Sequence, residues 1–189
     1  MMNQKAKQVD KQSAHDDMAA MPDARSAQLL AAKLAVLRSQ RDAVREMLMN
    51  AERSQADAQA EANYHIGAMA SRYDTFKEEA QYLVDAQKLR VLELSVLLAE
   101  YEGLIRDLPK AMHQRVMLGA CVILTNEQSP RYFFISPATI GAALVIDGIS
   151  YHSIAITAPL IRPFVGKALY DYADETAHGL ESHYIAALF

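Results

Sequence analysis

Between residues 25 and 108, apolar side chains recur at alternating steps of three and four residues, and this pattern restricts the fold more than any other feature. The stretch contains no proline, and Gly67 and Gly103 are its only glycines. Such spacing forms an apolar stripe on an α-helix and lets two helices wind around each other. A first stripe comprises Leu30, Leu34, Leu37, Val44, Leu48, Ala51, Ala58 and Ala62, with Arg41 interrupting it. A second comprises Ala80, Leu83, Leu94, Leu97, Tyr101, Leu104 and Leu108, with Gln87 and Arg90 interrupting it.

A break separates the two stripes and indicates two helices. It contains Gly67 and two candidate caps, Ser71 and Thr75. The sequence from Thr75 to Glu78 has the form of a capping box, in which hydroxyl and carboxylate satisfy each other's backbone donors. Two arms of ~35 residues would reach on the order of 50 Å. We therefore expect an antiparallel hairpin. The alternative is one continuous helix in an intermolecular coiled coil.

Beyond Pro109 the composition is typical of strands and turns, which predicts an α+β fold. The predicted strands cover residues 116–124, 131–135, 144–146, 149–151, 154–156 and 183–188. Asp147 and Gly148 form a tight-turn dipeptide between two of them. Residues 160–169 are predicted to be helical, with Pro163 in the first turn, where its missing N–H costs little. We divide the chain into a flexible N-terminal tail (1–24), a coiled-coil hairpin (25–110) and a C-terminal domain (111–189).

The charge balance argues against direct binding to nucleic acid. The net charge is −4, with 15 basic and 17 acidic residues up to Lys110, and 4 and 6 after it. Neither part is the basic surface that binds phosphates. No run of ~18 apolar residues predicts a membrane span, and residues 1–24 lack the apolar segment of a signal peptide. We expect a cytoplasmic protein.

Cysteine and histidine usage gives no sign of a catalytic or metal site. The single cysteine, Cys121, lies in an apolar run and is interpreted as a buried strand residue. No two of the six histidines have i, i+4 spacing, and no His/Cys cluster of a zinc site is present. We therefore expect no enzyme activity and no bound metal or cofactor of its own.

Several motifs, in the right order, resemble the GreA/GreB family of transcription elongation factors. Residues 154–171 are similar to the "SPLxxALxGK" region of that family, with Ala158, Pro159, Leu160, Phe164, Gly166 and Lys167 at motif positions. Residues 118–124 and 179–185 resemble the "FGSxVxL" and "GxxxEYEI" segments that open and close its C-terminal domain. Residues 73–81 resemble "YHAAKEEQG", which begins its second helix. The resemblance covers about residues 25–189.

This resemblance implies a protein partner and a mode of binding. The family has an FKBP-like C-terminal domain that docks at the β′ rim of the RNA polymerase secondary channel, while the coiled coil reaches towards the active site. On this basis residues 158–167, including Arg162, would bind the polymerase. The hairpin tip would comprise Tyr64, His65, Met69, Arg72 and Tyr73. We expect a monomer that comes near nucleic acid only through the polymerase.

The tip departs from the family pattern. Cleavage-stimulating members carry an acidic pair in "DLxENAEYH" that helps hold a catalytic Mg²⁺ of the polymerase, an ion that prefers oxygen ligands. Aligned on Tyr73, that pair falls on Ile66 and Met69, which predicts that cleavage stimulation is weak or lost. Two alternatives remain open: a register that places Asp57 at the first acid with Glu61 close to the second, and a longer tip loop that gathers Asp57, Glu61 and Asp74.

Two other functions compete with this interpretation. The chain could be a coiled-coil adaptor or scaffold that keeps a Gre-like fold but serves another protein partner. An FKBP-like isomerase is disfavoured, because the sequence has no tryptophan and its aromatic residues are dispersed.

Overall fold

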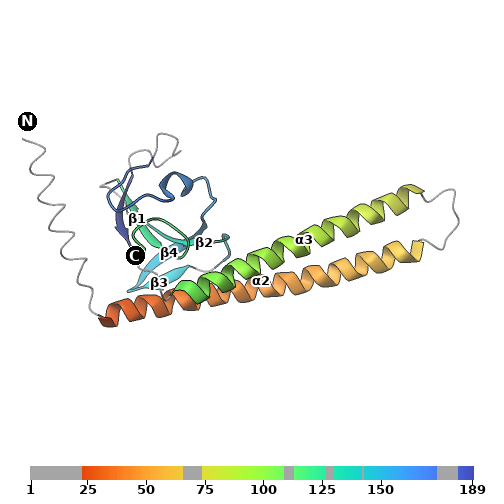
Figure 1. The fold of residues 1–189 in the computed structure, drawn as a ribbon, viewed down its shortest axis with the longest axis horizontal. Coiled ribbons are helices and arrows are strands. Elements are labelled where there is room, and N and C mark those ends of the chain that lie inside the picture. The colour runs from red at the N-terminus through yellow and green to blue at the C-terminus, as the bar shows by residue number, and fades with distance from the viewer. Residues whose placement is uncertain (1–22, 66–73, 109–112, 127–129, 142, 174–182) are drawn as a thin grey trace, which may run out of the picture.

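The computed structural model describes residues 23–65, 74–108, 113–126, 130–141, 143–173 and 183–189. Within these ranges the fold is α+β, as predicted: two long helices are followed by five strands and one short 3₁₀ helix (Figure 1). The helices are α2 (Asp23–His65) and α3 (Asp74–Asp107). The other elements are β1 (Cys121–Thr125), β2 (Arg131–Ser136), β3 (Leu144–Ile146), β4 (Ile149–Ala155), η2 (Arg162–Phe164) and β5 (Tyr184–Leu188).

Helices α2 and α3 lie side by side as a hairpin, which favours the first of the two predicted arrangements (Figure 1). Helix α2 begins at Asp23, two residues before the predicted boundary of the hairpin. Helix α3 begins at Asp74, so Thr75 lies inside the first turn and does not precede it. Residues 1–22 and 66–73 lie outside the described residues. They include all of the predicted tail (1–24) except residues 23 and 24, which belong to α2. They also include Gly67, Ser71 and three of the proposed tip residues (Met69, Arg72 and Tyr73).

The seam of α2, that is, the apolar stripe that packs against α3, follows the predicted heptads. Only the position of its polar interruption differs. Leu37, Val44, Ala51 and Ala58 recur every seven residues and are buried. Between Leu37 and Val44, Gln40 and not Arg41 is the polar residue inside the seam, with 1% of its surface exposed. Leu30, Leu34 and Leu48 lie half-buried at its edge.

The seam of α3 is displaced from the prediction at its N-terminal end. Leu94, Tyr101 and Leu108 are buried as expected, but Val84 is buried in place of Leu83, whose exposure is 48%. Residues one position apart point about 100° apart around a helix. Val84 therefore faces Ala58 and Ala62 of α2, and these three residues form a small apolar cluster of their own. Leu83 points away from it.

The five strands form one mixed sheet in the order β3-β4-β2-β1-β5. Strands β2 and β4 pair in parallel, and the other neighbours pair antiparallel. The predicted hairpin turn is confirmed, with Asp147 at φ 50° and Gly148 at φ 78°. Residues 154–156 are not a separate strand, since β4 continues through Ile154 to Ala155.

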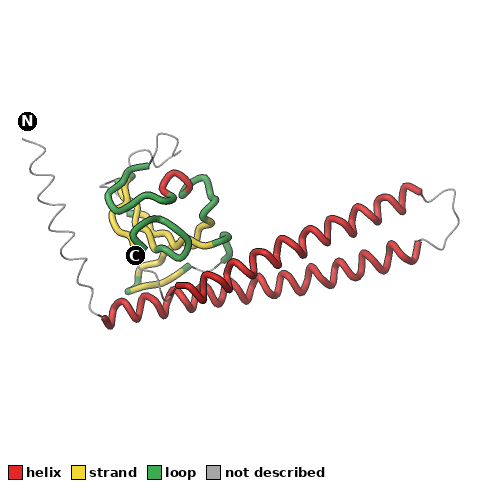
Figure 2. The backbone as a smooth tube through the Cα atoms, viewed as in Figure 1, coloured by secondary structure: helices red, strands yellow, loops and turns green. Residues whose placement is uncertain are grey.

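Two predicted elements are much shorter than expected. Residues 116–120 do not extend β1, because Gly119 has φ +83° and turns the chain away. Residues 160–169 contain only η2, with Pro163 in its first turn (Figure 2). Gly166, at φ +80°, ends the helical run, and its N–H donates to the Val116 carbonyl at 2.8 Å. Pairing with a distant segment thus replaces the helical hydrogen bonds that the local sequence favours.

Candidate functional site

A layer of buried polar side chains joins the base of the hairpin to the sheet. Gln40 of α2 donates from Nε2 to the Ser153 hydroxyl at 2.8 Å and to the Ile140 carbonyl at 3.1 Å. Ser153 lies in β4, and its hydroxyl is 2.8 Å from that of Ser136 in β2. Because buried hydrogen bonds have strict geometry, these contacts fix the direction in which α2 leaves the sheet.

Helix α3 is tied to the same place by its buried tyrosine. The Tyr101 hydroxyl donates to the Ala138 carbonyl at 3.2 Å, and the Ser136 hydroxyl donates to the same carbonyl at 2.7 Å. Burial raises the pKa of Tyr101, and the hydrogen bond to Ala138 opposes that shift. The sequence predicted that Tyr101 lies in the apolar seam, but not that its hydroxyl makes a hydrogen bond to the C-terminal domain. Both helices are therefore held through neighbouring atoms of one polar layer.

A second group at the junction combines a buried lysine, a cysteine and a histidine. Lys33 is 5% exposed and donates from Nζ to the Phe189 carbonyl at 2.9 Å. Burial lowers the pKa of Lys33. Burial raises the pKa of Cys121 to about 12, against the opposing charge of Lys33. The thiol is therefore protonated and unreactive near neutral pH, which agrees with the interpretation of Cys121 as a buried strand residue.

Among the described histidines, His113 has the most strongly shifted pKa. It is 8% exposed, and neither ring nitrogen has a hydrogen-bond partner. Burial, and secondarily the charge of Lys33, lower the pKa of His113 to about 4. His113 is thus neutral at physiological pH and packs as a core residue beside Gly119.

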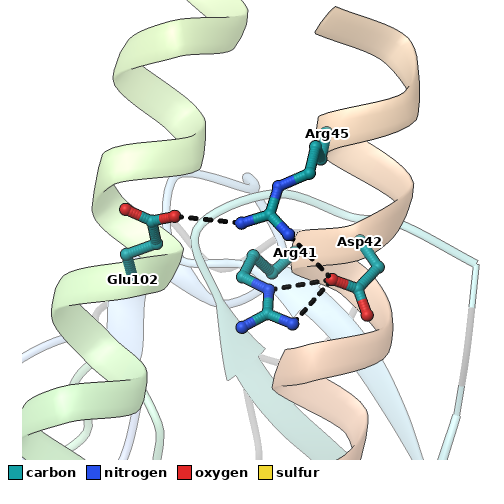
Figure 3. Close-up of polar contacts among 4 residues, drawn as sticks. All are labelled: Arg41, Asp42, Arg45 and Glu102. Atoms are coloured by element: carbon teal, nitrogen blue, oxygen red, sulfur yellow. Dashed lines mark hydrogen bonds and ion pairs between the residues drawn. The ribbon is translucent and has the colours of Figure 1, made fainter. Parts of the chain in front are cut away.

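Ion pairs on the surface add a lateral link between the helices next to the junction (Figure 3). Arg45 of α2 lies 3.3 Å from Glu102 of α3 and 3.8 Å from Asp42 on its own helix. Arg41 makes a tighter contact with Asp42, at 2.6 Å. Exposed pairs of this kind contribute at most ~1 kcal/mol each. The buried polar layer, and not these pairs, therefore sets the orientation of the hairpin.

The predicted partner-binding segment, residues 158–167, forms a tightly hydrogen-bonded loop around η2. The Arg162 N–H donates to the Ala158 carbonyl at 3.0 Å, and Arg115 donates from Nη1 to the Gly166 carbonyl at 2.9 Å. Pro159, Arg162, Val165 and Gly166 are exposed, while Ala158, Leu160 and Lys167 are partly buried. The loop therefore presents an apolar surface with a cationic side chain on a fixed backbone.

Phe164 differs from the other predicted binding residues. It is fully buried in the sheet core with Ile161, Val116 and Ile185. In this conformation Phe164 cannot touch a partner, and it supports the loop from below. Met117, by contrast, is 49% exposed and follows Val116, which pairs with Gly166 and Lys167. No sequence motif includes Met117, which was only a methionine in a predicted strand.

The far end of the hairpin presents two of the three candidate tip acids. Asp57 and Glu61 are exposed on α2, four residues apart, and so share one face of the helix. Asp74 is the first residue of α3. Tyr64 and His65 are the last two residues of α2, and their side chains lie outside the described part. Within the described residues no group of three His, Cys, Asp or Glu side chains could hold a metal ion.

The sequence prediction missed the polar layer. No sequence motif includes the residues of this layer and its neighbour, Gln40, Lys33, Ser136 and Ser153. The Gln40–Ser153 and Lys33–Phe189 contacts each join positions more than 100 residues apart. A signal was present only in retrospect: Lys33 and Gln40 fall at seam spacing relative to Leu37 and Val44, where polar residues need buried partners.

The comparisons with known proteins give a distant structural likeness. The GreA factor homolog 1 (Gfh1) protein of Thermus thermophilus matches with a TM-score of 0.30 and 15% identity, over 82% of this chain and 94% of that chain. A second structure of the transcription factor Gfh1 matches with a TM-score of 0.30 and 13% identity, over 79% of this chain and 92% of that chain.

No protein-family model matches the chain, and no curated protein matches it. Among the described residues no helix is long and apolar enough to cross a membrane. The structural likeness is distant and identifies no function.

Proposed function

We propose that this protein is a Gre-like factor that binds RNA polymerase, with residues 158–167 docking at the rim of the secondary channel and the hairpin entering it. The observation that carries the proposal is a long hairpin held at its base by buried hydrogen bonds from Gln40 and Tyr101. Helix α2 has 43 residues, a length of about 65 Å at ~1.5 Å per residue. A hairpin of fixed direction beside an exposed loop suits a protein that docks with one part and probes a channel with the other.

The proposal keeps the finer expectations from the sequence. The C-terminal domain would be FKBP-like, the protein would act as a monomer in the cytoplasm, and any Mg²⁺ involved would belong to the polymerase. The chain itself would not be an enzyme. Asp57 and Glu61 lie on one exposed face of α2, but two carboxylates four residues apart on a helix do not form a metal site by themselves. We therefore propose that stimulation of transcript cleavage is weak or lost.

A pull-down with core RNA polymerase tests the docking. The full-length chain should retain the polymerase, and Arg162→Glu should weaken retention at least several-fold, because it reverses the charge of an exposed loop residue. Arg131→Glu is the matched control: Arg131 is also an exposed arginine of the C-terminal domain but lies at the start of β2. Recovery of no polymerase subunit would rule out the proposal.

Transcript cleavage is tested on a backtracked elongation complex with Mg²⁺. We expect the chain to bind without shortening the RNA appreciably. If it does shorten the RNA, replacing Asp57, Glu61 and Asp74 together by alanine should abolish that activity. Efficient cleavage that survives the triple substitution would show that the assignment of the tip acids is wrong.

A second candidate is an adaptor that binds another protein through its coiled coil. The observation that favours it is the row of exposed apolar side chains on α3, including Leu89 and Leu92, which are 57% and 60% exposed. The same pull-down separates the candidates, since an adaptor would be recovered with a protein other than the polymerase.

A further inference from the structure

Helix α3 carries a second apolar stripe on the side opposite its contact with α2. Tyr82, Leu89, Leu92 and Val96 follow one another at steps of seven, three and four residues and are 52–76% exposed. Asp85 occupies the missing step of this series, and exposed Ala99 continues it. The face of the same helix that packs against α2 carries buried Leu94 and half-buried Val91 and Leu98. Each stripe residue lies two positions from a seam residue, which is about 200° around the helix.

This second stripe has the spacing of a coiled-coil seam. Scattered apolar residues on a surface need no explanation, but alternation of three and four residues over more than two heptads is the pattern that packs against another helix. Helix α2 already covers the opposite side of α3. The occupant of the second stripe must therefore come from outside the described hairpin.

We propose that the stripe pairs with the same stripe of a second copy, in antiparallel orientation. The charges within the stripe decide the orientation. Exposed Arg106 lies on the same face of α3, seven residues after Ala99. Parallel pairing would set Asp85 against Asp85 and Arg106 against Arg106 of the other copy. Antiparallel pairing, with Leu92 opposite Val96 of the other copy, instead brings Asp85 within one helical turn of the other Arg106. Buried or partly buried like charges cost more than exposed pairs gain.

The large and small residues of the stripe are also complementary in this register. Leu89 would face Ala99 of the other copy, and Leu92 would face Val96. At one edge, Lys88 would lie near Glu102 of the other copy. The contacts that Lys88 and Glu102 make within one chain, to Asp85 at 3.4 Å and to Arg45 at 3.3 Å, are exposed and weak enough to be shared. Glu93 would face itself across the twofold axis, with Arg90 at 3.5 Å on its own helix to offset the repulsion.

The expected affinity is low. Exposed side chains of this size present on the order of 100 Å² of apolar surface each. Two copies would bury roughly 800 Å² from the four large residues, plus their neighbours, which lies below the standard range of about 1,200–2,000 Å² and corresponds to a weak, transient interface. The protein should therefore be monomeric when dilute and dimeric in the upper micromolar range, and this inference does not depend on the proposed polymerase binding.

Sedimentation velocity of the full chain over a concentration series tests the pairing. The wild type should shift from monomer to dimer, and Leu92→Glu should raise the dissociation constant at least tenfold, because it places a carboxylate in the interface. Met49→Glu is the matched control: Met49 is also a half-exposed apolar residue (48%), but it lies on α2. A wild type that stays monomeric throughout the series would overturn the proposal, as would equal effects of the two substitutions. If Leu92→Glu weakened only polymerase retention, the stripe would belong to that partner and the pairing proposal would be wrong.

Disulfide cross-linking tests the orientation. A mixture of Leu92→Cys and Val96→Cys chains should form mixed disulfides efficiently, whereas either variant alone should not. In the antiparallel register, two copies of residue 92 are offset by four residues, about 6 Å along the axis, which with the lateral separation exceeds the span of a disulfide. The native Cys121 is buried and does not compete. Efficient cross-linking of Leu92→Cys alone would indicate parallel pairing and contradict the proposal.

Discussion

At the scale of single residues, the least expected feature is a neutral histidine in the core of the junction. His113 is buried without a hydrogen-bond partner, and its pKa is lowered to about 4 by burial and by Lys33. An unfolded chain would bind a proton at this site with a pKa near 6.5. Between these two values the unfolded state therefore holds more protons than the folded state, and stability must fall as the pH falls.

We expect His113 to make the protein less stable by up to about 2 kcal/mol when the pH is lowered from about 7 to about 5. Urea unfolding at the two pH values measures this difference. His113→Gln should lose most of the pH dependence in this range, even if its stability at neutral pH is lower. An unchanged pH slope in the variant would mean that another group is responsible.

At the scale of elements, the register of the helices is decided by their contact with each other. The sequence supplies two adjacent apolar residues in α3, Leu83 and Val84, and the pattern alone predicted Leu83 for the seam. The structure buries Val84 against Ala58 and Ala62, since the small alanines leave room for a short β-branched side chain. Leucine is the more hydrophobic residue, but the geometry of the opposing helix determines which of the two is covered.

We expect Val84→Ala to lower the free energy of unfolding by about 1–2 kcal/mol, because it removes methyl groups from a fully buried site. Leu83→Ala should change it by no more than about 0.5 kcal/mol, as expected of an exposed position. Chemical denaturation followed by circular dichroism measures both. If Leu83→Ala lowered the free energy of unfolding more than Val84→Ala, Leu83 and not Val84 would lie in the seam, as the sequence predicted.

At the scale of the whole molecule, the polar layer between the hairpin and the sheet makes the two parts one body. Gln40 and Tyr101 come from different helices, yet their partners, Ser153 and Ala138, lie close together because Ser136 contacts both. Leu37 of α2 and Phe134 of β2 also belong to one buried apolar cluster. Such packing tolerates sliding, whereas directional hydrogen bonds select one orientation.

We expect Gln40→Ala to cost about 2–3 kcal/mol, since it removes the donor to the Ile140 carbonyl and to Ser153 and opens a cavity. Hydrogen exchange should rise in β4 and at the base of α2. Gln59→Ala is the control: Gln59 makes an exposed hydrogen bond to Asn63 at 3.2 Å, on the same helix but away from the sheet. If both variants exchange like the wild type, the polar layer does not fix the hairpin.

The sequence alone determined the α+β class, the two helices, the Asp147-Gly148 turn and the burial of Cys121, because each depends on neighbours within a few residues. Heptad spacing, turn dipeptides and apolar runs act locally. It also singled out residues 158–167 as a motif, but it predicted residues 160–169 to be helical.

The tertiary structure decided everything that depends on distant partners. Residues 160–169 have a helical pattern, but Gly166 and Lys167 pair with Val116 and leave only the turn at 162–164. Gln40 became a hydrogen-bonding residue of the junction because β4 and the Ile140 carbonyl lie beside it. The exposure of the second stripe on α3 likewise depends on where α2 packs. Local propensities are worth fractions of a kcal/mol per residue, so long-range hydrogen bonds and burial override them wherever the two compete.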